Sequence, residues 1–369
     1  IVRGLMAALE RKGFEVRIFE VDASSYQPPW YCFMDICSFE PDLIIQANIP
    51  SSVLFPRELA RTLAVPRVVW YVDNPVYFWQ PHPNFFFTEH DHVFVSDTIS
   101  VDFARSCGAQ NVGVLYLSGS TDLQVSDQPR EDLRCPLSFV GQIVNVSDIW
   151  NMLTEEENRA LTCLIDLRLQ DPWADMQGLL AGLTAEQTSL VSRIPQRLKT
   201  PLHSLLYITS NARQRIQVLE SVAQYGLKLY GTDAWLTVPA EDSPLRKCYC
   251  GPVEYRTEFP LVCKSSDINL NINSLQDVHS PNMRIYDVPL LDGFLLSDWF
   301  PGADNFLVPD REMVFWRTID ELRRKIEYYL DHPDERQEVI QRGKQRILRD
   351  HTYDARADQL LRELGIAVL

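Results

Sequence analysis

Short apolar segments that alternate with amphipathic helical segments are the feature that most limits the fold of this chain. The apolar segments are continuous rather than alternating in hydrophobicity, which is typical of strands buried on both faces of a sheet. Helical segments such as Arg57–Leu63 separate them. This order predicts parallel β-α-β units with helices on both faces of the sheet. The strands predicted in the first third of the chain are Pro41–Gln46, Pro66–Val72, His92–Ser96 and Asn111–Leu117.

The N-terminal segment predicts a helix followed by a strand. Apolar residues recur at helical spacing from Val2 to Lys12, and Gly13 ends the helix as a C-cap. The alternating segment Phe14–Phe19 then predicts a strand. Because a helix comes before the first strand, we expect the chain to begin inside a β-α-β unit whose first strand precedes Ile1.

A second series of strands and helices starts at Pro136–Gly141, after an acidic, Pro-containing stretch at 126–134 that has the composition of a linker. Residues 147–205 interrupt this series with two or three amphipathic helices and no strand pattern. The series resumes with a helix at Asn211–Gly226. The strands that follow are predicted at Leu227–Tyr230, Ile268–Ile272 and before Asp298.

The length of 369 residues exceeds what one hydrophobic core usually serves. We therefore predict an α/β protein with two Rossmann-like, doubly wound domains. The first domain covers 1–125, and the second covers 126–352 with a helical insertion at 147–205. A C-terminal helix at 353–369 closes the chain.

Composition excludes some classes of protein. The formal net charge is −15 at pH 7, which argues against a general nucleic-acid binder, although a local cation cluster can still bind an anion. The eight cysteines are scattered without a C-x-x-C pair, which predicts reduced thiols and a cytoplasmic location. No apolar run approaches the roughly 20 residues of a membrane span.

Polar residues follow most of the predicted strands. In open parallel sheets the ligand lies beyond the carboxyl ends of the strands, so these residues are the first candidates for a site. They fit ordinary turns as well as a binding site. They are Asn48, Asp73, Asn74 and Asp97 in the first domain, and Gly141, Gln142, Gly231, Thr232, Asp233, Asn273, Ser274 and Asp298 in the second.

The segment HSPNMRIYDVPLLDGFLLSDWF, 279–300, carries the strongest local signal. Ser280 is the expected N-cap and Pro281 the first helical residue of a helix that continues to Leu291. Free N–H groups at such a helix start, with Arg284 in the first turn, suit a phosphate. The alternative is an Arg284–Asp287 pair on a solvated helix face.

The same segment resembles the CgeB-like glycosyltransferases. Ser280-Pro281, Arg284, Gly293, Asp298 and His351-Thr352-Tyr353 match motifs of the C-terminal half of that family. KLYGTDAW, SSDINLNIN, WYVDNPV and FVSD also resemble family segments, so the similarity covers most of the chain outside the insertion. The resemblance implies a GT-B fold, in which two Rossmann-like domains face a cleft and the second domain binds a sugar nucleotide.

The resemblance also implies roles for residues of the second domain. Arg284 and the backbone amides from Ser280 through Asn282 to Met283 would face the diphosphate, and Gly231 lies in a family-like segment that we count with the donor site. Asp287 stands where the family has a ribose-binding Glu. That shorter acid and Pro289 inside the helix are departures from the family pattern.

Further candidates come from the residues themselves. Asp73 is the candidate general base or acceptor ligand, His279 the candidate for a phosphate or sugar contact with a catalytic role, and Lys264 an alternative cation for the diphosphate. Pairs such as His90 with His92 lack a third ligand, so no metal site is predicted. The aromatic stretch Tyr77–Phe87 fits either a loop core or a surface that stacks on an acceptor.

Together with these candidates, the resemblance implies a metal-independent hexosyltransferase. It would move a sugar from a UDP- or GDP-linked donor to a protein or glycan acceptor, with no further cofactor. The helical insertion could form a homodimer contact. Two alternatives remain open at this stage: a non-catalytic GT-B-like binding or assembly protein, and a sugar-nucleotide epimerase.

Overall fold

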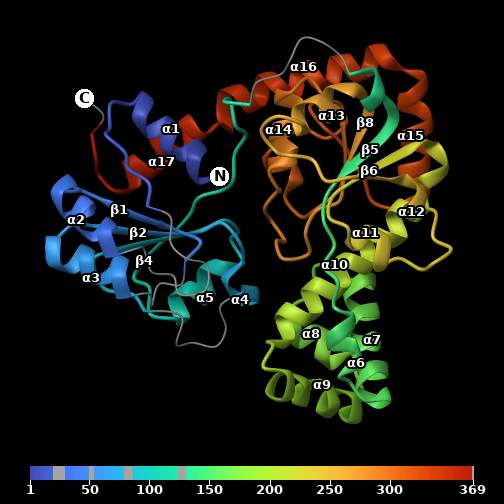
Figure 1. Ribbon diagram of the computed structural model, residues 1–369, viewed down its shortest axis with the longest axis horizontal. Coiled ribbons are helices and arrows are strands. Elements are labelled where there is room, and N and C mark those ends of the chain that lie inside the picture. Colours follow the sequence, from blue (N-terminus) through green and yellow to red (C-terminus); the bar gives the residue numbers. More distant parts are fainter. Residues whose placement is uncertain (20–29, 50–53, 79–85, 124–129, 368–369) are drawn as a thin grey trace. The chain divides into compact units, whose positions relative to one another are not determined.

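The chain forms two compact units in a computed structural model (Figure 1). The structure describes residues 1–19, 30–49, 54–78, 86–123 and 130–367. Unit 1 comprises Ile1–Ser118 together with His351–Leu369, and unit 2 comprises Gly119–Asp350.

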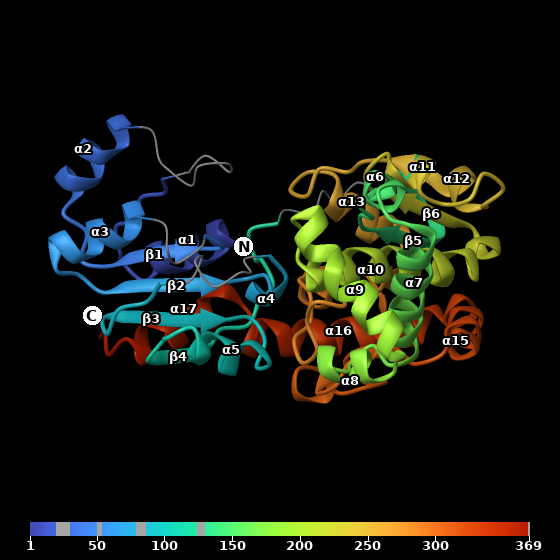
Figure 2. The same ribbon diagram turned by 90° about the horizontal axis from the view of Figure 1, so that it is seen from below.

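Unit 1 is built on a parallel sheet in which the strand order follows the chain, β1-β2-β3-β4 (Figure 2). Every residue of β2 is buried, as its continuous apolar sequence predicts. The strands are β1 (Ile44–Ala47), β2 (Arg67–Tyr71), β3 (Asp91–Val95) and β4 (Asn111–Val114). The helices are α1 (Val2–Arg11), α2 (Trp30–Phe39), α3 (Leu54–Leu63), α4 (Pro75–Phe78), α5 (Ser100–Ser106) and α17 (Tyr353–Glu363).

The predicted strand Phe14–Phe19 is wrong. The structure describes these residues outside any strand, although their side chains keep an alternation of partly buried and exposed positions up to Arg17. An alternating pattern gives a strand only where a neighbouring strand completes its hydrogen bonds.

The C-terminal helix α17 packs on α1 within unit 1. Arg11 and Lys12 form ion pairs with Asp354 and Asp358, at 2.8 and 2.6 Å. At Gly4 a Cβ atom would lie 2.4 Å from the Tyr353 ring, so only glycine allows the two helices to approach this closely. The contact explains why the last residues of the chain belong to unit 1.

A buried ion pair ties the first residues of β2 and β3 together. Arg67 donates to both carboxylate oxygens of Asp91, at 2.8 and 2.6 Å, and the two side chains are 1% and 3% exposed. Asp91 also accepts a hydrogen bond from the backbone of Thr88. The Asp91 carboxylate, which stands between His90 and His92 in the sequence, therefore has a structural role in unit 1.

Unit 2 contains a six-stranded parallel sheet in the order β10-β9-β8-β5-β6-β7. The central position of β5 and β8 places their apolar residues Leu137, Phe139, Ile268 and Leu270 in the core of this unit. The strands are β5 (Cys135–Val140), β6 (Leu227–Tyr230), β7 (Tyr249–Gly251), β8 (Ser266–Asn271), β9 (Leu295–Asp298) and β10 (Val314–Trp316).

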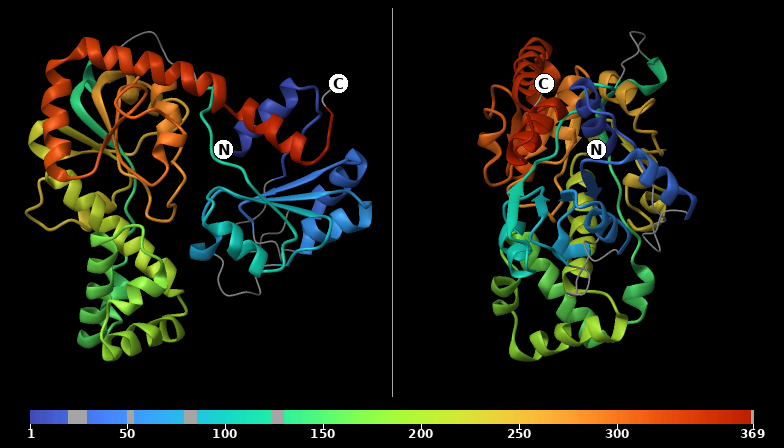
Figure 3. Two further views of the ribbon diagram at one scale, coloured as in Figure 1. Left: turned by 180° about the vertical axis from the view of Figure 1, so that it is seen from behind. Right: turned by 90° about the vertical axis from the view of Figure 1, so that its left-hand side faces the viewer.

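Residues between β5 and β6 form a helical subdomain with its own apolar core (Figures 1 and 3). Its helices are α6 (Ser147–Asn151), α7 (Glu155–Gln170), α8 (Met176–Ala181), α9 (Ala185–Leu198) and the first half of α10 (Leu202–Glu220). Thr154 and Thr184 begin α7 and α9 with capping boxes.

The predicted break between 205 and 211 is wrong, because α10 is one continuous helix. Neither Gly nor Pro stands between Leu202 and Glu220, so nothing in this stretch stops a helix. The polar residues in its middle occupy buried or partly buried positions of the helix.

The other elements of unit 2 surround its sheet. The remaining α-helices are α11 (Ala234–Thr237), α12 (Leu245–Cys248), α13 (Phe259–Ser265), α14 (Arg284–Leu290), α15 (Ile319–Asp331) and α16 (Pro333–Asp350). Short 3₁₀ turns lie at Glu131–Leu133, Ala223–Tyr225 and Ala303–Asn305.

Neither a membrane-spanning helix nor a cluster of metal ligands occurs in the described part of the chain. None of its helices combines the length and apolar character needed to cross a membrane. None of its His, Cys, Asp and Glu side chains form a group of three able to hold a metal ion.

Candidate active site of unit 2

Polar side chains gather at the carboxyl edge of the unit 2 sheet. All strands of this sheet run in the same direction, so their carboxyl ends share one edge. Gln142 follows β5, Asn273 follows β8, and Asp298 ends β9. Two arginines, Arg284 from α14 and Arg215 from α10, lie close enough to this edge to interact electrostatically with each other, and Arg215 also with Asp298.

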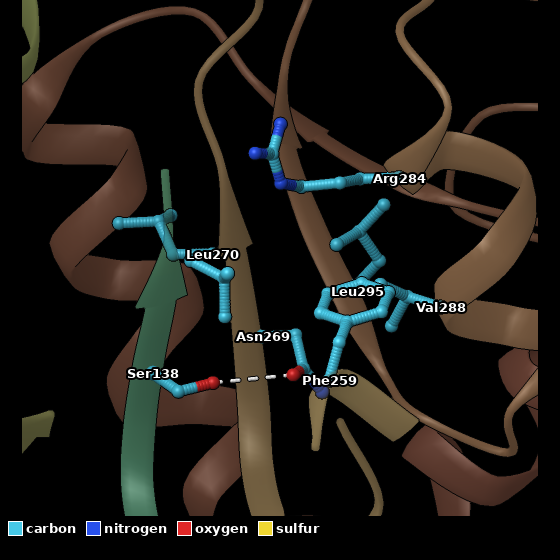
Figure 4. Close-up of a pocket in the computed structure, with 8 residues that line it drawn as sticks. Ser138, Phe259, Asn269, Leu270, Arg284, Val288 and Leu295 are labelled. Carbon is cyan, nitrogen blue, oxygen red and sulfur yellow. Dashed lines mark hydrogen bonds between the residues drawn. The ribbon is translucent and has the colours of Figure 1, made fainter. Parts of the chain in front are cut away.

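Arg284 is the first cation of this site. It lines a small cavity of about 10 Å³, whose apolar walls include Leu270, Val288 and Leu295 (Figure 4). The guanidinium forms no ion pair or hydrogen bond with any residue the structure describes. Burial lowers the pKa of Arg284 to about 10, and the charge of Arg215 lowers it further.

Arg215 is the second cation. It is 8% exposed, its Nη1 donates to the Gln142 carbonyl, and its guanidinium carbon lies 5.9 Å from the centre of the Phe139 ring. The Nε atom is buried and has no partner among the described residues. Burial lowers the pKa of Arg215 as well. Within the described chain neither arginine has a carboxylate within ion-pair distance, so two like charges share a site that a polyanion would stabilise.

The start of α14 differs from the prediction. The helix begins at Arg284 with Met283 as its N-cap, and no side chain caps it there. Ser280 is buried but lies four residues before the helix, so the prediction that it caps the helix is wrong. Asn282 takes a related role: its Oδ1 accepts the Arg284 amide at 3.0 Å, in an Asx turn. Its Nδ2 donates to Asn271 at 2.9 Å.

Asp287 is 1% exposed and is bound within unit 2. One carboxylate oxygen accepts from the Tyr255 hydroxyl at 2.6 Å, and the other accepts from the Ser120 amide at 3.0 Å. Burial raises its pKa to about 6, against the opposing effect of the Tyr255 hydrogen bond. The chain thus uses both oxygens itself, and a contact of Asp287 with ribose stays a prediction.

Asp298 has two carboxylate oxygens in different environments. Oδ1 accepts from the amide and the side chain of Asn273 at 2.8 and 2.9 Å, with Ser297 Oγ at 3.4 Å. Oδ2 has no partner among the described residues. Burial raises the pKa of Asp298 to about 7, and the Asn273 and Ser297 hydrogen bonds and the charge of Arg215 act in the opposite direction.

Two predicted donor-site residues have other surroundings. A Cβ atom at Gly231 would lie 2.1 Å from the Gly141 carbonyl oxygen, and the Gly231 amide donates to Gly251. This glycine therefore permits close packing of two loops. Lys264 is exposed in the last turn of α13, two residues before β8 begins. It lies at the amino end of that strand, so the structure does not bring it to the carboxyl edge.

The two predicted catalytic residues lie in different units. His279 is half-buried in the connection between β8 and α14 of unit 2. Asp73 follows β2 of unit 1, where its carboxylate accepts from Asn48 Nδ2 at 2.6 Å and its amide donates to Asn48 Oδ1. Asn48 has a positive φ of 55°, which Asn tolerates better than most residues. Residues 79–85 of the predicted aromatic stretch and 126–129 of the predicted linker lie outside the described residues.

Sequence reasoning missed Arg215 as a site residue. The helix that follows the first strand of a Rossmann-like domain usually begins at its carboxyl edge, and here the helical subdomain separates β5 from that helix. Arg215 lies in the middle of α10, and no motif around it in the sequence indicates that it reaches the carboxyl edge of the sheet. Asp298 belongs to the polar residues at the predicted strand ends, and this strand-terminal position is the signal that the sequence offers for it.

Comparison with known proteins agrees with this architecture. Residues 213–362, less than half of the chain, match the family model described as glycosyl transferase-like. The match begins within α10 and ends in α17, so it contains both arginines of the site. No curated protein sequence matches the chain.

Solved structures resemble the chain over nearly its whole length. T4 phage BGT in complex with its UDP-glucose substrate aligns with a TM-score of 0.53 at 12% identity, over 98% of this chain and 93% of that one. A variant of S. aureus TarM in complex with UDP and saccharide ligands gives 0.51 at 9% identity, over 90% and 58%. Anabaena HepE with UDP and glucose gives 0.47 at 12%, over 98% and 88%.

These similarities define the class of protein. The chain has the GT-B fold, with two parallel-sheet α/β domains, and this prediction is confirmed. Its C-terminal part is glycosyl transferase-like in sequence as well.

Proposed function

We propose that this chain is a glycosyltransferase of the CgeB-like type that moves a hexosyl group from a UDP- or GDP-linked donor to a protein or glycan acceptor. The observation that supports it best is the pair of Arg215, which is buried, and Arg284, which is partly buried, neither with a carboxylate partner in the described chain. A nucleotide diphosphate supplies the charge that such a pair lacks. The T4 phage relative, which is solved with UDP-glucose, supports the same donor class.

The chemistry follows from the charges. Transfer breaks the bond between the anomeric carbon and the diphosphate oxygen, and the diphosphate leaves with the bonding electrons. A new bond forms to an acceptor oxygen, whose proton passes to a base. Arg215 and Arg284 would stabilise the charge that grows on the leaving group, and we propose no metal for this task. Asp73 is the proposed base, and His279 a proposed contact to phosphate or sugar.

Binding of pyrophosphate, UDP and GDP, measured by isothermal titration calorimetry, tests the cation pair. We expect Arg284→Ala and Arg215→Ala each to weaken UDP or GDP binding by about ten- to a hundredfold, the usual effect of one lost charge-assisted hydrogen bond. Arg213→Ala is the matched control, because Arg213 lies on the same helix and pairs with Asp166 at the surface. Failure of the wild-type protein to bind pyrophosphate or any nucleotide would contradict the proposed function.

A sugar-nucleotide hydrolysis assay then separates an enzyme from a non-catalytic GT-B-like protein. We expect slow release of the sugar by the wild-type protein and a loss of about 10²–10⁴-fold in Asp73→Asn, as for removal of a general base. Nucleotide binding by Asp73→Asn should stay unchanged. Binding without any turnover would favour the non-catalytic alternative.

A further inference from the structure

The helix α10 belongs to two cores at once. Leu205 and Leu206, in its first half, pack in the core of the helical subdomain. Ala212, Val218 and Leu219, in its second half, pack in the core of the sheet. The middle of the helix is therefore held from both sides, and its side chains have little freedom to reach other partners.

Buried polar atoms without partners concentrate in this middle part. They are Ser210 Oγ, Asn211 Oδ1, Gln214 Oε1 and Arg215 Nε, and no residue that the structure describes bonds to them. A buried polar atom without a hydrogen bond destabilises the folded chain, because it loses its bond to water and gains none in return. Four such atoms within two turns of one helix indicate a place where a polar ligand binds.

The polar face of α10, defined as Tyr207, Asn211 and Gln214, points at the carboxyl edge of the sheet. Positions 207, 211 and 214 are four and three residues apart and so share one side of the helix. At one end of the face, the Tyr207 hydroxyl lies 3.0 Å from Ser274 Oγ, in the loop after β8. Next to the other end, Arg215 bonds to the Gln142 carbonyl after β5.

Asp298 adds a carboxylate to the same place. It lies near enough to Arg215 for the two charges to interact. Its Oδ1 is held by Asn273, and its Oδ2 has no partner in the described chain. A carboxylate oxygen that can still accept a hydrogen bond thus stands beside the polar face of α10.

The chemistry of this set differs from that of the two arginines. A carboxylate repels a phosphate, whereas carboxylate and amide oxygens accept hydrogen bonds from hydroxyl groups. We propose that the polar face of α10 and Asp298 bind the hydroxyl groups of the sugar that is transferred, and so select the donor sugar. The inference rests on the proposed function, because it takes Arg215 and Arg284 as the diphosphate site.

The test compares three ligands on each variant. Pyrophosphate reports the cation pair, UDP or GDP reports the nucleotide, and the best-bound member of a panel of UDP- and GDP-sugars reports the sugar. The quantity of interest is the sugar increment, defined as the Kd of the nucleotide diphosphate divided by the Kd of its sugar derivative. We expect Asn211→Leu and Gln214→Leu to lower the sugar increment by about tenfold, the effect of about one hydrogen bond, with pyrophosphate binding unchanged.

Asp298→Asn should change pyrophosphate affinity and the sugar increment in different directions. Loss of its negative charge should leave pyrophosphate binding as tight or tighter, while the sugar increment falls. Gln217→Leu is the matched control, because Gln217 is exposed on the same helix, and its sugar increment should stay at the wild-type value. Unchanged pyrophosphate affinity also shows that each variant is folded.

Three outcomes would overturn the inference. One is a wild-type sugar increment of one, and another is an unchanged increment in Asn211→Leu, Gln214→Leu and Asp298→Asn, which would leave water as the partner of the buried atoms. The third is an equal loss of pyrophosphate, nucleotide and sugar-nucleotide binding. Absence of all binding in the wild-type protein would instead contradict the proposed function.

Discussion

At the scale of single residues, unit 2 holds ionisable side chains near its carboxyl edge whose pKa values are shifted by burial. Burial raises the pKa of Asp298 to about 7 and that of Asp287 to about 6, and it lowers that of Arg284 to about 10. Each shift means that the folded protein disfavours the charged form of the group. Sites that bind charged ligands often carry such groups, because the ligand supplies the missing partner.

The raised pKa of Asp298 predicts a dependence of stability on pH. The folded state binds its proton up to about pH 7, whereas the unfolded state releases it near pH 4, so stability falls as pH rises between these values. Asp298→Asn removes this loss. We expect the variant to be more stable than wild type at pH 8, by up to about 4 kcal/mol, and the gain to shrink toward pH 4. Thermal unfolding at pH 5, 6, 7 and 8 measures it; a gain that does not change with pH would contradict the prediction.

The buried pair of Arg67 and Asp91 in unit 1 predicts a second result. Arg67→Met leaves a buried carboxylate without its cation and should cost about 3–5 kcal/mol of unfolding free energy. Arg67→Met combined with Asp91→Leu should recover most of that loss, because no charge then remains buried. Urea unfolding followed by a probe in unit 1 measures both. A double variant as unstable as the single one would show that the pair contributes more than charge compensation.

At the scale of elements, close approaches between loops decide the shape of the carboxyl edge. Gly231 permits the loops after β5 and β6 to meet, since a Cβ there would overlap the Gly141 carbonyl at 2.1 Å. Trp235 fixes the same place by donating from Nε1 to the Gly141 carbonyl at 2.9 Å. Gly231 thus shapes the site indirectly, because its missing side chain lets the loop after β5 lie against the loop after β6.

Gly231→Ala should therefore destabilise unit 2. The obstacle is a backbone oxygen, which cannot move aside as a flexible side chain would, so we expect a loss of about 1–3 kcal/mol in unfolding free energy. Gly178→Ala in α8 is the control, because its Cβ would meet only Asp175 Oδ1 at 3.2 Å. That change should be neutral or stabilise the helix by up to about 1 kcal/mol. Equal effects of the two changes would contradict the packing argument.

At the scale of the whole molecule, the chain returns to unit 1 after completing unit 2. The α17 helix covers α1 through Tyr353 and two ion pairs. Arg356 adds a hydrogen bond from Nε to the Tyr116 carbonyl, which follows β4, at 3.1 Å. Unit 1 is thus assembled from the two ends of the chain.

Truncation after Asp350 should destabilise unit 1 far more than unit 2. The truncated protein exposes the face of α1 that α17 covers, so we expect faster hydrogen exchange in α1 and in the strands of unit 1. Amides of β5 and β8 should exchange at the wild-type rate. Removal of 366–369 alone is the control and should change neither unit. Equal acceleration in both units would show that the two units unfold together.

Sequence patterns were sufficient for the parallel strands and for most of their helices. Continuous apolar segments identified β1, β2, β3, β5 and β8, because strands of this kind are buried on both faces. The short strands β7 and β10 and the continuity of α10 escaped, since three residues carry too little pattern and buried polar residues resemble a boundary. The segment Phe14–Phe19 had the pattern of a strand without a strand beside it in the described chain.

The amino-acid sequence by itself determined two α/β domains with parallel sheets and Arg284 as a residue beside a strand end. Both follow from local periodicity and from the position of polar residues along the chain. Only the tertiary structure decided that Arg215, 69 positions before Arg284 in the sequence, stands close to it, and that Lys264 does not stand at the carboxyl edge. The physical reason is that pairing of strands far apart in the chain places side chains at one edge or the other, and spacing along the sequence does not contain that information.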